Sequence, residues 1–479
     1  MKIRNNLTRI LVSLSLVFGI TFTSFGQAPA NKPAQPQEKD RGQILTEIGE
    51  AQVEFDKEPS NAEARFRLAR LLYQAGDFET ADSLLQPLLA AEKPSNDLLL
   101  FLGAELEYLF GRYEKVENLL QKIIALNPGE LQIQARAQAK LVFAYYQSNQ
   151  YAKTADFFKG LEGNIKLPVW DLMKAFGQER PYQVVWPQGT KLTETPFIVT
   201  DPLPVISVEL DGRPIHALID TGADAFILDN EIAASMGIKS ISSMMGTFAG
   251  GKQAEVGFAK AESLKIGEVT LKAVPVSLLP TQRFSKGFAG GKYTIGGILG
   301  TGVLKQFLST LDYGGGRLIL RRPDEEGRQE MMRSAMGKTV AEVPFVMAAT
   351  HFMMARGRLD DKDGLTLFVD SGLASEAAFT APLQTLKYAG IPVPETKVQE
   401  GIGGGGGGGF ATGQFPIKKL GLGSLVQENL KGDYGATPPE SYWRLGFIND
   451  GIISHQFLRK YAWTIDFARM KMIFVAGGR

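Results

Sequence analysis

The chain has 479 residues, which exceeds the size of one hydrophobic core, so about two to four domains are expected. Its 52 Lys and Arg residues nearly balance 51 Asp and Glu residues, and the formal charge of +1 provides no field for nucleic acid or an acidic membrane. The absence of cysteine excludes disulfides, lipid attachment through cysteine and thiol catalysis.

Residues 1–26 have the pattern of a secretory signal peptide. Three basic residues precede an apolar run over residues 10–22, and small residues before Gln27 form a cleavage site. The apolar run is short for a bilayer span of about 20 residues, so we expect cleavage and no stable membrane span afterwards. Because exported eukaryotic domains usually use cysteine, we expect a bacterial protein of the periplasm or the extracellular space.

A linker over residues 27–42, rich in Pro, Gln and Ala, leads into a periodic helical region over residues 43–162. Gly76-Asp77-Phe78 recurs 35 residues later as Gly111-Arg112-Tyr113, and Asn149-Gln150-Tyr151 begins a looser third copy. The region resembles tetratricopeptide repeats, whose helix pairs bury their apolar faces only against neighbouring pairs. The resemblance implies a protein partner bound through the repeats.

Aromatic residues are frequent in these repeats and allow two interpretations. They can line a peptide groove, or they can form the core between helices, which repeat packing alone already explains. The residues concerned are Tyr108, Tyr113, Tyr145, Tyr146 and Tyr151.

The helical period fades in a proline-punctuated connector over residues 163–195, which can add a strand or a cap to the first β block. Short alternating strands then predict two all-β blocks, over residues 196–325 and 340–479. Asp211-Gly212 predicts a hairpin turn before the first block's second strand.

Each block carries an aspartate in a tight turn after an apolar strand: Asp220-Thr221-Gly222 in the first and Asp370-Ser371-Gly372 in the second. Ionising both of two neighbouring carboxyl groups is energetically unfavourable, so they share a proton, and one serves as base while the other serves as acid. Either string alone is a common β-turn, in which the aspartate caps its own backbone.

Further features repeat in the same order and indicate an internal duplication. Ile298-Leu299-Gly300 ends 80 residues after Asp220, and Ile452-Ile453-Ser454 ends 84 residues after Asp370. Each block also contains a glycine-rich hairpin between its turn and this apolar loop. The hairpin residues considered are Phe248, Gly250 and Gly251 in the first block and Gly403 and Gly404 in the second.

On these motifs, residues from about 196 to 479 resemble a tandem pair of retropepsin-like domains, as in secreted bacterial aspartyl proteases. The resemblance implies a multidomain chain in which all-α tetratricopeptide-like repeats precede two all-β barrel lobes. It also implies an aspartic-type endopeptidase that acts on a peptide or protein substrate without a cofactor or metal. The implied roles are catalysis for Asp220 and Asp370, support of the dyad for Thr221, Gly222, Ser371 and Gly372, closure by the two hairpins, and packing under the dyad for the two apolar loops.

Two positions in the second block depart from this pattern: Ser454 replaces a glycine, and Leu373 replaces a small residue. They favour a second hypothesis, a non-catalytic periplasmic binding or scaffold protein whose repeats recruit a partner. A third possibility is a dyad formed by two first lobes across a homodimer, which would leave Asp370 idle.

Overall fold

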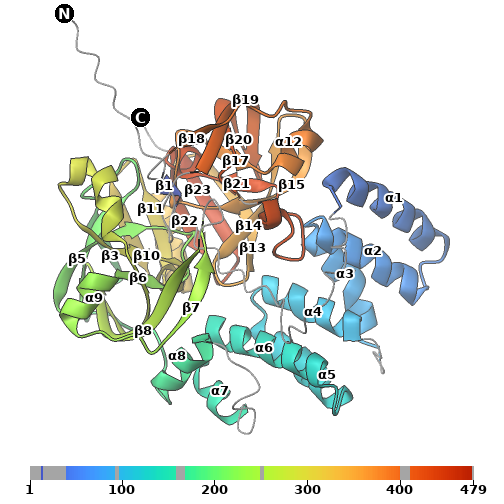
Figure 1. Ribbon diagram of the computed structural model, residues 1–479, viewed down its shortest axis with the longest axis horizontal. Helices are drawn as coiled ribbons and strands as arrows, with labels where there is room; N and C mark the ends of the chain where they lie inside the picture. The colour runs from blue at the N-terminus through green and yellow to red at the C-terminus, as the bar shows by residue number, and fades with distance from the viewer. Residues whose placement is uncertain are drawn as a thin grey trace, which may run out of the picture.

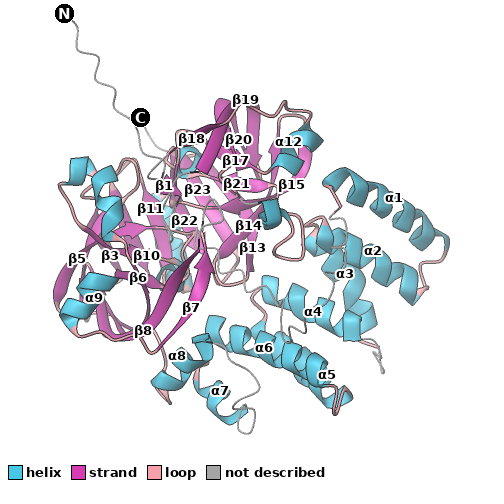
Figure 2. Ribbon diagram, in the orientation of Figure 1, coloured by secondary structure: helices cyan, strands magenta, loops and turns pink. Residues whose placement is uncertain are grey.

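The computed structural model describes residues 12–13, 39–91, 97–157, 168–248, 253–399, 410–437 and 439–476. The predicted signal peptide therefore lies outside the described residues except for Val12–Ser13. Helices make up the N-terminal part, and strands with a few short helices make up the rest (Figure 2). The chain is an N-terminal helical repeat followed by two barrel-like β lobes, with the repeat curving along both lobes (Figure 1). None of the described helices is long and apolar enough to cross a membrane.

The helical repeats form antiparallel pairs, and the residues that recur at the predicted period lie in the turns within the pairs. Gly76 and Gly111 have φ of 80° and 70°, and Asn149 has φ of 58° at the equivalent turn of the third copy. Glycine and asparagine tolerate this left-handed backbone, which explains the repeat signature. The helices are α1 (Arg41–Lys57), α2 (Ala62–Gln74), α3 (Phe78–Leu89), α4 (Asp97–Leu109), α5 (Tyr113–Leu126), α6 (Leu131–Gln147) and α7 (Ala152–Phe157).

The connector is built into the lobes instead of standing apart from them. Its helix α8 (Pro168–Phe176) packs on strands β7 and β8 of the first lobe. Its strand β2 (Gln183–Val185) pairs with β9, and β3 (Leu192–Pro196) pairs with β12.

The first lobe is an eight-stranded sheet in the order β2-β9-β6-β10-β5-β4-β8-β7. The predicted hairpin joins β4 to β5, and alternate residues of β4 point into the core. The strands are β4 (Val205–Leu210), β5 (Arg213–Ile219), β6 (Phe226–Asp229), β7 (Ser242–Thr247), β8 (Gln253–Ile266), β9 (Val269–Leu279) and β10 (Ile295–Leu299). Short helices are α9 (Asn230–Met236), α10 (Thr301–Leu304) and the 3-10 turns Gln282–Gly287 and Ala289–Gly291.

The second lobe belongs to a thirteen-stranded sheet, which also takes in strands from the end of the first lobe. Its order is β18-β19-β20-β17-β21-β15-β14-β13-β23-β22-β11-β12-β3. The strands are β11 (Leu308–Asp312), β12 (Arg317–Arg321), β13 (Val340–Ala348), β14 (Phe352–Leu359), β15 (Lys362–Val369), β17 (Phe379–Ala381), β18 (Lys397–Gln399), β19 (Phe410–Leu422), β20 (Leu425–Tyr434), β21 (Gly451–Ile453), β22 (Tyr461–Asp466) and β23 (Lys471–Ala476). Helices are α11 (Glu325–Ser334), α12 (Leu383–Ala389), α13 (His455–Leu458) and the 3-10 turn Pro439–Tyr442.

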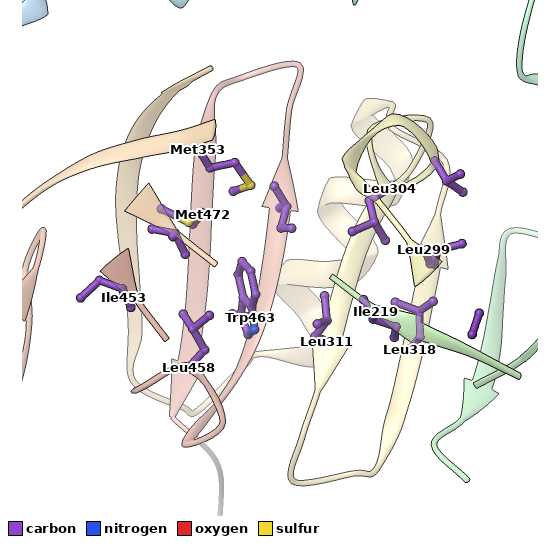
Figure 3. Packing of buried hydrophobic residues seen from close by; sticks show 14 of the residues in the cluster. Ile219, Leu299, Leu304, Leu311, Leu318, Met353, Ile453, Leu458, Trp463 and Met472 are labelled. Atoms are coloured by element: carbon purple, nitrogen blue, oxygen red, sulfur yellow. The ribbon is translucent and has the colours of Figure 1, made fainter. Parts of the chain in front are cut away.

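The two lobes share one hydrophobic core at their junction. Leu311 on β11 and Trp463 on β22 are register partners, and both are buried. Figure 3 shows Trp463 facing Leu311, with Ile219 and Leu299 of the first lobe beyond it. This shared core fixes the lobes relative to each other.

The repeats bury a second apolar surface against the second lobe. Tyr73 and Phe78 pack edge-on against Phe447, with ring centroids 5.8 and 4.8 Å away. Phe368 of β15 lies in the same buried cluster. The repeat module is therefore an integral part of the folded body.

A two-residue strand lies beside the second lobe's aspartate turn. In β1, Val12 pairs antiparallel with Ala374 and Ser13 pairs with Leu373, which together form β16. The backbone beyond the Asp370 turn thus accepts an extended strand.

Candidate active site

The two predicted catalytic aspartates end matched strands, one in each lobe. Asp220 follows β5 and donates its backbone N–H to Leu299 O of the parallel strand β10, at 3.1 Å. Asp370 follows β15 and donates to Ile453 O of the parallel strand β21, at 3.0 Å. The duplication inferred from the sequence therefore places both turns in equivalent backbone settings.

The turns meet face to face, so that each glycine lies against the other lobe's aspartate. A Cβ added to Gly222 would lie 2.6 Å from Asp370 Oδ1, and one added to Gly372 would overlap the carboxyl group of Asp220. Each glycine N–H also donates to its own aspartate, at 2.6 Å in the first turn and 2.8 Å in the second. Only glycine permits this approach, and the structure brings Asp220 and Asp370 together within one chain.

The two hydroxyl residues of the turns are joined reciprocally. Thr221 N donates to Ser371 Oγ at 3.0 Å, and Ser371 N donates to Thr221 Oγ1 at 2.9 Å. Thr221 Oγ1 in turn donates to Val369 O at 3.1 Å. Both residues are fully buried. The exchange holds one turn to the other and fixes the separation of the carboxyl groups.

Burial and mutual repulsion shape the ionisation of the pair. Both aspartates are fully buried. Burial raises the pKa of Asp220 well above its ordinary value, and the neighbouring Asp370 charge and carboxyl hydrogen bond raise it further, while the N–H groups of Gly222 and Gly372 lower it. The site therefore retains a proton where isolated carboxyl groups would be ionised. One protonated and one ionised carboxyl can act as an acid and a base.

The apolar loops under the turns differ at one position, which is Gly300 in the first lobe and Ser454 in the second. A Cβ on Gly300 would overlap the carbonyl oxygen of Ala225, so the first lobe needs glycine there. Ser454 is fully buried and donates its hydroxyl to Ala377 O at 2.5 Å.

We attribute the space for Ser454 to the length of the neighbouring chain segment. Strand β6 begins six residues after Asp220, whereas β17 begins nine residues after Asp370, so the second lobe's returning segment is longer. The predicted packing residues Ile298 and Ile452 are both buried beside the turns, in strands β10 and β21.

Among the predicted flap residues, Phe248 belongs to the described part of the chain. It lies just beyond β7 and is buried in a cluster that contains Ala223 and Ala374, which come after the two aspartate turns. Gly250, Gly251, Gly403 and Gly404 lie outside the described residues. Leu373, the other departure from the resemblance, is buried in the cluster shared with the repeats.

The structure adds a group of residues at Asp224 that the sequence analysis missed. Asp224 is buried four residues after Asp220 and accepts a hydrogen bond from Tyr146 of α6 at 3.0 Å. Lys305 donates to Gln147 O and Oε1 at 2.8 and 2.9 Å, and Gln147 Nε2 donates to Thr350 O at 2.8 Å. The end of α6 thus contacts both lobes. The only sequence signal was the proximity of Asp224 to Asp220.

The predicted tyrosines are core residues, as the second interpretation expected. Tyr146 and Tyr151 are buried among the helices and stack at 5.5 Å. Tyr146 also reaches Asp224, and Tyr108 donates to Ala349 O of the second lobe. These aromatics are core residues that also join the repeats to the lobes.

Comparisons with known proteins agree with this architecture. Residues 206–303 match the family described as Aspartyl protease, and residues 51–104 match the family described as Tetratricopeptide repeat. The first match includes Asp220 and ends before Asp370, so the second aspartate rests on its Asp-Ser-Gly motif and on the geometry. No curated protein matches the sequence.

Among solved structures, the chain is similar to a retropepsin-like aspartic protease from Rickettsia conorii. The identity is 18%, the alignment covers 29% of this chain and 96% of that chain, and the TM-score is 0.20. At that score the likeness carries no argument. The match to the aspartyl protease family and the paired turns indicate a site of the aspartic-protease type.

Proposed function

We propose that this protein is an exported aspartic-type endopeptidase that uses Asp220 and Asp370 of one chain. The observation that carries the proposal is the mutual approach of the two turns, in which each glycine lies against the opposite carboxyl group. The match of residues 206–303 to the aspartyl protease family supports it.

In the proposed reaction, the ionised carboxyl removes a proton from a water as that water attacks the peptide carbonyl carbon. The protonated carboxyl donates to the carbonyl oxygen, which gives a neutral tetrahedral intermediate. Transfer of a proton to the leaving nitrogen then breaks the C–N bond and releases a free acid and a free amine. The Thr221–Ser371 exchange keeps the carboxyl groups in place throughout.

The departures in the second lobe are compatible with this activity. The longer segment before β17 accommodates Ser454, and its hydroxyl is paired with Ala377 O. The Asp370 backbone retains the same anchoring bond as that of Asp220. These features remove the steric reason for assigning the second lobe a binding role only.

The test uses the chain from Gln27 onward, a diverse peptide library, and acid to neutral pH. Asp220→Asn and Asp370→Asn should each abolish cleavage, whereas Asp363→Asn, exposed on the strand that leads to Asp370, should not. Full activity of either dyad variant would overturn the proposal. Peptide binding without cleavage in any of the proteins would favour the scaffold hypothesis.

Folding of the dyad variants can be checked independently. Replacing one of two buried, repelling carboxyl groups with an amide of similar shape should leave the melting temperature unchanged or raised at neutral pH. For export, we propose that the pattern over residues 1–26 directs secretion. Protein recovered from the periplasm or medium should then begin at Gln27, and a cytoplasmic, uncleaved chain would overturn that part.

A further inference from the structure

A cavity of about 610 Å³ lies where the repeats meet both lobes. Its walls come from α4, α5 and α6, from β7 and β8 of the first lobe, and from the β13–β14 turn and the segment before β21 in the second. Figure 1 shows α4 next to β13, and the two elements are in contact. A volume of this size is within the range of ligand-binding pockets.

The cavity adjoins the candidate active site. Asp224 forms part of its wall and is four residues from Asp220 along the same turn. Tyr146 holds the Asp224 carboxyl group, and Thr350 of the opposite lobe also lines the space. The repeats therefore enclose one end of the region between the lobes.

The direction of a bound chain can be inferred from β1 and β16. Val12 lies opposite Ala374 and Ser13 opposite Leu373, so this strand runs toward the Asp370 turn with its C-terminal side leading. Asp224 and Ala374 each stand four residues after their aspartates, and because the two turns are matched and face each other, we infer that these residues flank the dyad from opposite sides. A peptide in this direction presents the residues after its scissile bond to the cavity.

Apolar side chains and a cation characterise the cavity itself. Phe143, Val169 and Phe258 line it, which suits apolar side chains of a ligand. Lys140 and Glu105 form an ion pair with each other. Arg136 stacks 4.3 Å from the Phe101 ring centroid, and among the described residues no carboxylate pairs with it.

Arg444, from the second lobe, also lines the cavity. The Lys140–Glu105 pair is neutral, and Lys305 offsets the charge of the Asp224 carboxyl group, so the guanidinium of Arg136 is a positive group of the wall with no carboxylate partner among the described residues. The cavity therefore fits a ligand that is apolar along its length and anionic at its end.

We propose that this cavity binds the carboxyl-terminal end of the peptide substrate, with the terminal carboxylate at Arg136, so that cleavage occurs near substrate C-termini. The inference rests on the proposed peptidase function for its catalytic consequence. A guanidinium binds a carboxylate through paired, charge-assisted hydrogen bonds, which an amide cannot replace.

The test compares peptides that differ only at the end: a free carboxylate, a carboxamide, and a version extended by several residues. The intact protein should cleave the free-carboxylate peptide with a kcat/KM roughly tenfold to a hundredfold above that of the carboxamide. In Arg136→Gln this ratio should fall to about one. Arg67→Gln, which alters an ion pair outside the cavity, should keep the wild-type ratio.

Equal cleavage of the carboxylate and carboxamide peptides by the wild-type protein would overturn the inference. So would an Arg136→Gln variant that keeps the wild-type ratio. Binding to Asp220→Asn, measured by fluorescence anisotropy with the same peptides, separates this inference from the proposed function. A carboxylate preference in binding without cleavage in the wild type would sustain the cavity assignment and overturn the peptidase, whereas cleavage without the preference would do the reverse.

Discussion

The guanidinium of Arg41 and the carboxylate of Asp450 form a buried ion pair that joins the first repeat helix to the second lobe. Arg41 Nε donates to Asp450 Oδ1 at 2.8 Å, and a second nitrogen bonds Oδ2. Asp450 also accepts from Thr366 N on β15 at 2.8 Å. Because Asp450 precedes β21 and β15 leads to Asp370, the repeats are coupled to the backbone that carries the second aspartate.

Loss of Arg41 should therefore destabilise the whole protein. Arg41→Met would leave the Asp450 charge buried without its partner, which costs about 3–5 kcal/mol. Urea unfolding measures the loss. Arg67→Met, which breaks an exposed pair with Glu54, is the control and should cost less than about 1 kcal/mol. Adding Asp450→Asn to Arg41→Met should recover part of the loss, and equal costs for the two arginine variants would contradict the expectation.

The exchange between Thr221 and Ser371 should be needed for both stability and activity. Thr221→Val keeps the shape but leaves Ser371 N without its acceptor, at a cost of about 1–3 kcal/mol. Thr221→Ser keeps the hydroxyl and serves as the control. The melting temperature and the rate of peptide cleavage should both fall in Thr221→Val and be largely retained in Thr221→Ser. A Val variant as active as the Ser variant would show that the exchange does not position the dyad.

The two apolar loops should respond differently to small substitutions. Gly300→Ala places a Cβ against Ala225 O and Ala223 O, which are backbone atoms that cannot move aside cheaply, so a loss of about 1–3 kcal/mol or more is expected. Ser454→Gly creates no clash and removes the two hydrogen bonds of the hydroxyl, one to Ala377 O and one from Gln456 N, and glycine is itself a tolerated N-cap, so it should cost less. Denaturant midpoints measure the stability of both variants. A larger loss in Ser454→Gly than in Gly300→Ala would refute the loop-length explanation.

The pH dependence of stability should carry a contribution from Asp224. Burial raises its pKa from 3.8 to about 6, despite the opposing charge of Lys305. Between pH 4 and 6 the folded state binds more protons than the unfolded state, so this group makes stability fall as pH rises, by roughly 2–3 kcal/mol in all.

Asp224→Asn should remove that part of the slope, and urea midpoints measured from pH 4 to 7 reveal it. The exposed Asp363→Asn is the control. Lys305 contributes in a second pH range, because burial lowers its pKa from 10.5 to about 8. Between pH 8 and 10.5 the unfolded state binds more protons, so the stability should rise with pH there. A wild-type slope retained in Asp224→Asn would contradict the first expectation.

Much of the architecture could be predicted from local patterns in the sequence. The 35-residue period predicted the helix pairs because Gly76 and Gly111 occupy turns that need a left-handed backbone. The repeated order of strand, Asp-Thr/Ser-Gly turn and apolar loop predicted two equivalent lobes, because a strand and its turn are encoded by neighbouring residues. The same order identified Asp220 and Asp370 as a candidate pair.

Other features depended on contacts between residues far apart in the chain. Nothing in the spacing of Arg41 and Asp450, or of Tyr146 and Asp224, indicates that they meet, because their approach depends on how the repeats pack against the lobes. The accommodation of Ser454 likewise depended on the path of a longer segment. The sequence alone determined the repeats, the lobes and the paired turns, whereas only tertiary packing decided the cavity beside the dyad, since its walls come from three separately encoded parts of the chain.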